Sequence, residues 1–299
     1  MMKLFSGTSN KPLAEHIAKH LNISVSPVEI FIFPDGEKRI QIQEEVVDED
    51  CIIVQSTAIP TAENYMELFF IADGLKRSGA RSITVVMPYM GYQRQDHVFR
   101  PGEAVSLQVV IKTLENLGIT RMIACDLHSI KIPEFFNIPL THLSALPLFA
   151  AEIKKQGWEK LDSVLVSPDM GGIRRIKLIS EMLSDMPFVT IIKNRDLATG
   201  TIAAGGLQGE VTRRALIVDD MISSGGTIVQ ANDMLRAKGA EEVYVFVTHP
   251  VFSSDAPQLL QNSGVDKVYV TDSVDVPKNK HFPKLHILSL SSSISEALR

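Results

Sequence analysis

The chain is organised around the stretch Arg214-Ala215-Leu216-Ile217-Val218-Asp219-Asp220-Met221-Ile222-Ser223-Ser224-Gly225-Gly226-Thr227-Ile228. Within it, Leu216 to Val218 form a short apolar run, which predicts a buried central strand. Two carboxylates follow, and a loop of small residues then leads into the helix-like segment Val229 to Leu235. A strand, a small-residue loop and a helix N-terminus form an anion site, because loop and first-turn N–H groups point at one spot.

The loop has the residue types that a phosphate requires. Gly225 and Gly226 carry no side chain, so the backbone can approach a phosphate closely. Ser223, Ser224 and Thr227 add hydroxyl donors. The alternative is an ordinary strand-to-helix turn, since loops of Gly and Ser are common. The two carboxylates in front of the loop favour a binding site.

Asp219 and Asp220 cannot themselves hold a phosphate, because like charges repel. Beside a phosphate loop they need hydroxyl groups or a metal ion as partners. A sugar phosphate offers both a phosphate and hydroxyls, so the stretch predicts a sugar-phosphate site.

Composition excludes several classes of protein. A chain of 299 residues has room for two domains, and 45% hydrophobic with 22% charged residues is typical of a globular protein. A net charge of −5 argues against a nucleic-acid surface. Cys51 and Cys125 form neither a disulfide framework nor a zinc-ligand pattern. No run approaches the ~18 apolar residues of a membrane span, and the N-terminus lacks the apolar core of a signal peptide. We expect a cytoplasmic protein with no nucleic-acid or membrane partner.

One α/β unit occurs twice in the chain. Its first copy is predicted as the strand Cys51–Val54, a helix from about Asn64 to Lys76, a break at Gly79-Ala80 and the strand Ile83–Met87. The second copy follows the same order, with Ala215–Val218, Thr227–Lys238, Gly239-Ala240 and Val243–Val247. Alternating strands and helices predict the α/β class, with two domains that each have a mainly parallel sheet flanked by helices. We place their junction near Leu143–Leu148.

Polar segments follow several predicted strands, where ligands gather in α/β sheets. Pro34-Asp35-Gly36 predicts a hairpin turn, and Phe33 at its mouth is suited to stack on a base. In the loop after Pro88, Arg94 can hold a phosphate and Gln95 can pair with polar groups. A plain turn and a solvated loop are the alternatives for these two segments.

Three further strand ends carry candidate groups. His128 and Asp169 can share a Mg²⁺ with a polyphosphate, because Mg²⁺ uses few protein ligands. Lys193 and Arg195 end another strand, and the Gly-, Ala- and Thr-rich segment Leu197–Gly209 after them is expected to be a mobile loop suited to a lid. The alternatives are an ordinary hydrogen-bonded His and a solvated strand end.

Taken together, these segments resemble ribose-phosphate diphosphokinase along nearly the whole chain. The matching segments, in order, are Phe33–Glu37, Tyr92–Asp96, Asp126–His128, Ser167–Gly172, Lys193–Arg195 and Val218–Thr227. That family joins two phosphoribosyltransferase-like domains, so the resemblance implies residues 1–145 on the ATP side and 146–299 on the ribose 5-phosphate side, with the last helix able to pack back on the first domain. It also implies transfer of the diphosphoryl group of ATP to the C1 hydroxyl of ribose 5-phosphate with Mg²⁺, giving 5-phosphoribosyl 1-diphosphate and AMP for nucleotide biosynthesis.

The resemblance implies a role for each candidate residue. The ribose 5-phosphate site would consist of Arg195, Asp219, Asp220, Ser223, Ser224, Gly225, Gly226 and Thr227. The ATP site would consist of Phe33, Asp35, Gly36, Glu37, Arg94, Gln95 and Asp96. His128 and Asp169 would bind the metal, and Lys193 and Arg195 would be catalytic. It further implies a homo-oligomer, a dimer or a multiple of dimers, whose Phe33 turn completes a neighbour's ATP site.

Some positions depart from the family pattern, and two other functions stay open. Pro34 replaces the usual Ser, His97 stands where a basic residue is common, and Ser223-Ser224 replaces the commoner Asp-Thr. A type I phosphoribosyltransferase would also need the 219–227 stretch, but neither a second domain nor the other loops. A catalytically silent relative would lose active-site groups that are present here.

Overall fold

A computed structural model describes residues 2–160, 162–195 and 202–299, with the backbone alone described for 193–195 and 202–205. The chain divides into two compact units. The first unit consists of Met1–Leu143, Asp272–Asp275 and Ser289–Arg299, and the second of Ser144–Thr271 and Val276–Leu288. The C-terminal residues thus belong with the first unit.

The first unit is built on a parallel six-stranded sheet of order β2-β1-β5-β6-β7-β8. Its strands are β1 (Met2–Ser6), β2 (Val25–Ser26), β5 (Asp50–Val54), β6 (Ser82–Met87), β7 (Arg121–Cys125) and β8 (Leu140–Leu143). An antiparallel hairpin of β3 (Val28–Ile32) and β4 (Lys38–Ile42) lies outside this sheet. Its turn contains the predicted Pro34-Asp35-Gly36, so the hairpin prediction is confirmed.

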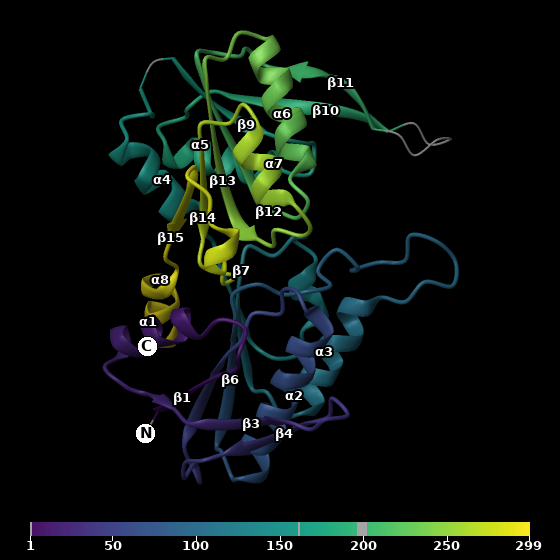
Figure 1. The fold of residues 1–299 in the computed structure, drawn as a ribbon, viewed down its shortest axis with the longest axis vertical. Coiled ribbons are helices and arrows are strands. Elements are labelled where there is room, and N and C mark those ends of the chain that lie inside the picture. Colours follow the sequence, from purple (N-terminus) through teal and green to yellow (C-terminus); the bar gives the residue numbers. More distant parts are fainter. Residues whose placement is uncertain (1, 161, 196–201) are drawn as a thin grey trace. The chain divides into compact units, whose positions relative to one another are not determined.

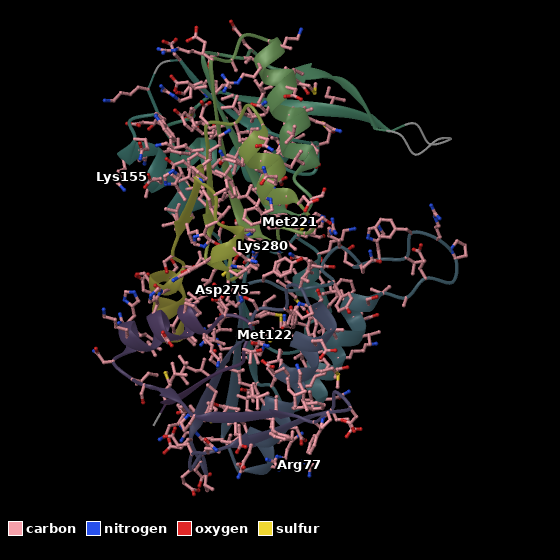
Figure 2. The ribbon with its side chains drawn as sticks, in the orientation of Figure 1. Arg77, Met122, Lys155, Met221, Asp275 and Lys280 are labelled. Atoms are coloured by element: carbon pink, nitrogen blue, oxygen red, sulfur yellow. The ribbon has the colours of Figure 1, made fainter. Side chains whose placement is uncertain are left out.

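Helices flank this sheet (Figure 1). They are α1 (Lys11–Leu21), α2 (Thr61–Arg77), α3 (Ser106–Asn116) and α8 (Ser291–Leu298), with the short 3₁₀ helix η1 (Ile132–Phe135). Helices α2 and α3 contribute their apolar faces to one core with the sheet, while α1 packs on β1 and against α8. At the end of α2, the exposed Arg77 (Figure 2) pairs with Asp73 at 2.7 Å.

The second unit has a seven-stranded sheet of order β11-β10-β9-β12-β13-β14-β15, parallel except for β11. Its strands are β9 (Ser163–Ser167), β10 (Phe188–Arg195), β11 (Ile202–Gln208), β12 (Arg214–Ile222), β13 (Glu242–Pro250), β14 (Lys267–Thr271) and β15 (Leu285–Leu288). The loop prediction for Leu197–Gly209 is therefore wrong where β11 runs. The small residues of this segment do not favour a strand by themselves, and the strand forms because its backbone pairs with β10. Residues 196–201 lie outside the described part.

Helices also cover the second sheet (Figure 1). They are α4 (Leu146–Lys155), α5 (Ile173–Met182), α6 (Gly226–Ala237) and α7 (Ala256–Asn262), with the 3₁₀ helix η2 (Lys278–Lys280). Helices α6 and α7 share an apolar core with the sheet. Trp158 stacks on Tyr244 with ring centroids 3.9 Å apart. Both sheets are mainly parallel and flanked by helices, so the predicted α/β fold class is confirmed.

The predicted duplication appears as two like strand–helix–strand units, β5-α2-β6 and β12-α6-β13. The helices even end alike. Gly79 (φ +86°) and Gly239 (φ +98°) both adopt the left-handed conformation after the helix. The amide of Ala80 donates to the carbonyl of Leu75 at 3.1 Å, and that of Ala240 donates to Leu235 at 3.0 Å. This is the Schellman arrangement, which favours glycine because a Cβ strains a left-handed backbone.

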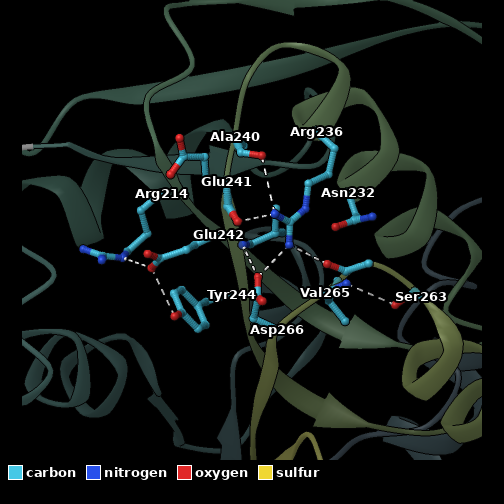
Figure 3. A network of polar contacts seen from close by, with 12 residues as sticks. Arg214, Asn232, Arg236, Ala240, Glu241, Glu242, Tyr244, Ser263, Val265 and Asp266 are labelled. Carbon is cyan, nitrogen blue, oxygen red and sulfur yellow. Dashed lines mark hydrogen bonds and ion pairs between the residues drawn. The ribbon is translucent and has the colours of Figure 1, made fainter.

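A charged network ties together the amino-terminal ends of β12, β13 and β14 (Figure 3). Arg214 on β12 donates to Glu242 on β13 at 2.7 Å. Arg236 on α6 donates to Asp266 at 2.7 Å, and the same carboxylate accepts the amide of Val243 at 2.7 Å. The network therefore holds the sheet at the end opposite to Asp219 and Asp220. Among the residues described, no helix is long and apolar enough to cross a membrane.

Candidate active site

The predicted phosphate loop connects β12 to α6 in the second unit. Gly225 is the N-cap of α6 with φ +83°, a left-handed conformation that favours glycine. Its carbonyl accepts the amides of Ile228 and Val229, both at 3.1 Å, which starts the helix. The amides ahead of these, at Gly226 and Thr227, have no acceptor within the helix and lie at its positive end. The loop thus has the local form of an anion site.

The three hydroxyls of the loop differ in their surroundings. Ser223 Oγ lies 3.1 Å from Ser253 Oγ, and the Ser253 amide donates to the Ser223 carbonyl at 3.0 Å. The side chains of Ser224 and Thr227 are exposed. Ser223 is thus held by its neighbour, while the other two hydroxyls face solvent at the start of the helix.

Asp219 and Asp220 lie within β12 instead of after it. The strand continues to Ile222 because its partner β13 extends to Pro250. Arg175 binds both carboxylates, with Nη1 2.9 Å from Asp219 Oδ1 and Nη2 3.3 Å from Asp220 Oδ1. The sequence predicts only hydroxyl or metal partners for the pair, whereas the structure adds a guanidinium that offsets their repulsion.

The two carboxylates share a largely buried environment. Burial and the neighbouring charge of Asp220 hold the pKa of Asp219 well above its usual range, although Arg175 acts in the opposite direction. The charge of Asp169 also raises the pKa of Asp219. Sugar hydroxyls both donate and accept hydrogen bonds, so a carboxyl group beside the Arg175 guanidinium can bind them in either protonation state.

The loop after β9 brings Asp169 to the same place. Its Oδ1 accepts the Gly172 amide at 3.1 Å, and its carbonyl accepts the Ser167 hydroxyl at 2.8 Å. β9 lies beside β12 in the sheet, so the loops at their carboxyl ends are neighbours. The structure thus unites Asp169, Asp219, Asp220 and the 223–227 loop. Lys193 and Arg195 end β10, the other neighbour of β9, but their side chains lie outside the described part.

In the first unit, the predicted adenine turn is a compact hydrogen-bonded loop. The amide of Phe33 donates to the Glu37 carbonyl at 2.8 Å, and Gly36, at φ +93°, donates to Phe33 at 2.9 Å. Asp35 Oδ1 accepts the Glu37 amide at 3.1 Å. Phe33 is 38% exposed and meets Phe31 edge to face at 4.9 Å. An aromatic face is therefore available at the turn.

A second cluster forms where β6 and β7 end. Arg94, Gln95 and Asp96 occupy the loop after β6, where Arg94 and Gln95 are exposed. Gln93 Oε1 accepts the amide of His128 at 3.0 Å, which joins this loop to the one after β7. No hydrogen bond or ion pair between described residues joins this cluster to the Phe33–Glu37 turn, and Figure 1 shows that turn apart from the loop ahead of α3.

The residues present fit a Mg²⁺ ion that a polyphosphate and water mainly coordinate. Among the described side chains, no group of three or more His, Cys, Asp or Glu could hold a metal ion by itself. The Asp219–Asp220 pair already has Arg175 as its cation. Mg²⁺ commonly keeps waters and binds through one or two carboxylates plus phosphate. His128 belongs to the first unit and Asp169 to the second, so their joint metal site stays a prediction.

Sequence reasoning missed Arg175 and Gln93. Arg175 follows Gly171-Gly172 in the first turn of α5, and the pair Arg174-Arg175 behind a glycine pair was the available signal. Gln93 is buried; its Oε1 accepts the amide of His128, and its Nε2 has no hydrogen-bond partner among the residues that the structure describes. The charge of its neighbour Arg94 favoured that residue, and not Gln93, as the predicted phosphate ligand of this loop.

Comparisons with known proteins give one answer. The model of the N-terminal domain of ribose phosphate pyrophosphokinase matches residues 2–118, and that of the phosphoribosyl synthetase-associated domain matches residues 196–299. Ribose-phosphate pyrophosphokinase of Fusobacterium nucleatum is 40% identical, over 99% of this chain and 94% of its own length. The enzyme of Corynebacterium ammoniagenes is 39% identical, over 99% and 93%.

A solved structure extends the likeness to the whole fold. The crystal structure of phosphoribosylpyrophosphate synthetase from Mycobacterium smegmatis matches with a TM-score of 0.93 at 33% identity, covering 100% of this chain and 97% of that one. The likeness in sequence and in fold thus spans almost the full length of both proteins. By these matches, the chain belongs to the ribose-phosphate pyrophosphokinase family.

Proposed function

We propose that this protein transfers the diphosphoryl group of ATP to the C1 hydroxyl of ribose 5-phosphate. The observation that carries the proposal is the joining, in one unit, of a phosphate loop at a helix N-terminus with a carboxylate pair held by Arg175. The loop suits the 5-phosphate and the carboxylates suit the ribose hydroxyls. A sugar phosphate is the ligand class that requires both.

The reaction needs positioning and charge more than covalent catalysis. The C1 hydroxyl oxygen forms a bond to the β-phosphorus of ATP, and the bond from that phosphorus to the oxygen bridging the α-phosphorus breaks. AMP leaves with the bonding electrons, and the hydroxyl proton passes to solvent. We assign Lys193 and Arg195 to the charge that develops on the transferring phosphates, since they end a strand beside β9, whose loop holds Asp169.

The first unit would supply the ATP site. Phe33 would stack on adenine, with Asp35, Gly36 and Glu37 at its edge, and Arg94, Gln95 and Asp96 would contact the phosphates. When bound, Mg²⁺ would offset the polyphosphate charge, with His128 and Asp169 as its protein ligands. We place this activity in nucleotide biosynthesis in the cytoplasm.

We further propose that the active protein is a homo-oligomer, a dimer or a multiple of dimers, with a shared ATP site. Within the first unit, the Phe33–Glu37 turn and the 94–96 loop lie apart, without a hydrogen bond or ion pair between them among the described residues. A neighbouring chain that presents its turn to the 94–96 loop would bring the two halves together. The same contact would cover the exposed Phe33.

The test is the identity of the nucleotide product. Purified protein incubated with ATP, Mg²⁺ and ribose 5-phosphate should release AMP and 5-phosphoribosyl 1-diphosphate in equal amounts. ADP as the product would instead identify an ordinary kinase. No turnover, together with transfer of phosphoribose from its diphosphate to a base, would identify a phosphoribosyltransferase.

A further inference from the structure

The β3–β4 hairpin has a charged residue at a position where its pattern favours an apolar one. Along β4, Lys38, Ile40 and Ile42 are partly buried while the residues between them are exposed. Ile40 and Ile42 pack on the first unit's core, and β4 lies against α2. Side chains alternate along a strand, so Lys38 faces the same way as these isoleucines. Its side chain is only 14% exposed.

The Lys38 ammonium meets a buried carboxylate of α2. Its Nζ lies 3.5 Å from Glu67 Oε2, and the Glu67 side chain is 1% exposed. The exposed Glu63, one turn earlier on α2, is also 3.5 Å away. A buried carboxylate is costly unless it is paired and hydrogen-bonded. The Lys38 ammonium therefore balances the charge of the buried Glu67 carboxylate, and this ion pair attaches the hairpin to α2.

Glu67 itself has little freedom to move. Its Oε1 accepts the amide of Thr8 at 2.5 Å and the side chain of Gln55 at 3.1 Å, while the Thr8 hydroxyl reaches both carboxylate oxygens at 2.8 and 3.0 Å. Even a Cβ at Gly7 would come within 2.8 Å of Oε1. Glu67 thus joins α2 to the loops after β1 and β5, and it forms a rigid anchor.

We propose that the Lys38–Glu67 ion pair fixes the Phe33–Glu37 turn for ATP, which makes both residues positioning residues of the diphosphoryl transfer. Lys38 directly follows Glu37, whose carbonyl accepts the Phe33 amide at 2.8 Å, so the turn moves as one body with Lys38. In the strand before the turn, Val28 packs on the core at the far end, whereas Phe31 and Ile32 next to the turn are exposed and give no such hold. The inference rests on the proposed function, in which this turn contacts adenine.

The test is Lys38→Met, which keeps the length of the side chain and removes its charge. A lost charge-assisted contact predicts a KM for ATP about three- to tenfold higher, with KM for ribose 5-phosphate within about twofold and kcat nearly unchanged. Amide hydrogen exchange should become faster in residues 28–42, which is a readout independent of activity. Lys38→Arg keeps the charge and should stay close to the unmodified protein in all of these quantities.

Arg77→Met is the matched control, because it removes the same charge from an exposed ion pair on α2 (Figure 2). It should change neither the KM for ATP nor exchange in the hairpin. Unchanged KM and exchange in Lys38→Met overturn the proposal. Faster exchange with an unchanged KM for ATP also overturns it, if Phe33→Ala does raise that KM. If Phe33→Ala has no effect on it either, the adenine assignment in the proposed function fails, and this proposal fails with it.

Discussion

Among single residues, Asp219 is a strongly perturbed acid of the candidate site. Its Oδ1 accepts hydrogen bonds from the Asp220 amide at 2.9 Å and from the Arg175 guanidinium at 2.9 Å. Burial and the charge of Asp220 still raise its pKa. The folded state therefore holds a proton on Asp219 more tightly than the unfolded chain does, and this difference makes stability depend on pH.

We predict that Asp219→Asn melts at a higher temperature than the unmodified protein at pH 7.5. An unfolded Asp titrates near pH ~3.9. Above that pH the unfolded chain binds fewer protons, so stability falls as pH rises towards the folded pKa. Asn does not ionise and avoids this loss of stability, so the melting temperature should rise by about 2–4 °C. Thermal unfolding at several pH values measures the rise, which should shrink as pH falls towards 4. A gain that is constant with pH would contradict the raised pKa.

For Asp220 we predict an effect on the sugar. Asp220→Asn keeps the size but loses the ionised acceptor, so KM for ribose 5-phosphate should rise about tenfold, the scale of one charge-assisted hydrogen bond. KM for ATP should change less. Steady-state kinetics with each substrate varied in turn provide the measurement. Asp233→Asn, the same change at an exposed position on α6, is the control. An increase confined to ATP would refute the assignment of Asp220 to the sugar.

Among the elements, the β12–α6 connection has glycines with two different roles, one set by backbone conformation and one by room for a ligand. Gly225 and Gly239 have left-handed backbones, whereas Gly226 begins the helix without one. A Cβ on Gly226 would meet nothing closer than Ser224 Oγ at 3.9 Å. The fold therefore has room for a side chain at Gly226, and only a ligand close to the backbone would exclude it.

We predict that Gly226→Ala folds with unchanged or slightly greater stability, by up to about 1 kcal/mol, because alanine restricts the unfolded chain. KM for ribose 5-phosphate should nevertheless rise about tenfold as the new methyl group obstructs the phosphate. Gly239→Ala gives the opposite result, with lower stability from backbone strain and an unchanged KM. Denaturant unfolding and kinetics on both variants test the pair. A normal KM in Gly226→Ala would show that no phosphate approaches this loop closely.

At the scale of the whole molecule, the candidate groups lie in separate units. The first unit has the Phe33 turn, the 94–96 loop and His128, and the second has the 223–227 loop, Asp169 and the end of β10. The proposed reaction needs both sets. If the Phe33 turn serves a neighbouring chain, defects in the two sets can compensate each other between chains.

We predict complementation between Asp35→Ala and Lys193→Ala. Each variant alone should be nearly inactive, since every site lacks one group. When the two are refolded together, some sites combine an intact adenine turn with an intact Lys193, and part of the activity should return. Two affinity tags that purify together would verify that subunits exchange. Verified exchange without recovered activity would refute a shared site.

Much of the architecture could be predicted from the sequence, because it depends on neighbours along the chain. Apolar runs and helical spacing locate β5, α2, β6, β12 and α6 to within a few residues. Gly79 and Gly239 mark the two helix ends because a left-handed backbone favours glycine. The Pro-Asp-Gly turn and the 223–227 connection between β12 and α6 are likewise local patterns. Segment Ile202–Gln208 was mispredicted, since its strand exists only by pairing with β10.

Which charged side chains meet depends on the fold. Arg175 reaches Asp219 across 44 positions of sequence, and Glu67 reaches Thr8 across 59. Such pairs depend on strand order and on the direction of each side chain, which no spacing along the chain encodes. The raised pKa of Asp219 has the same origin, because burial and neighbouring charge exist only in the folded protein. Local sequence patterns thus predict most of the elements and the types of chemical group, whereas folding sets which of these groups become partners.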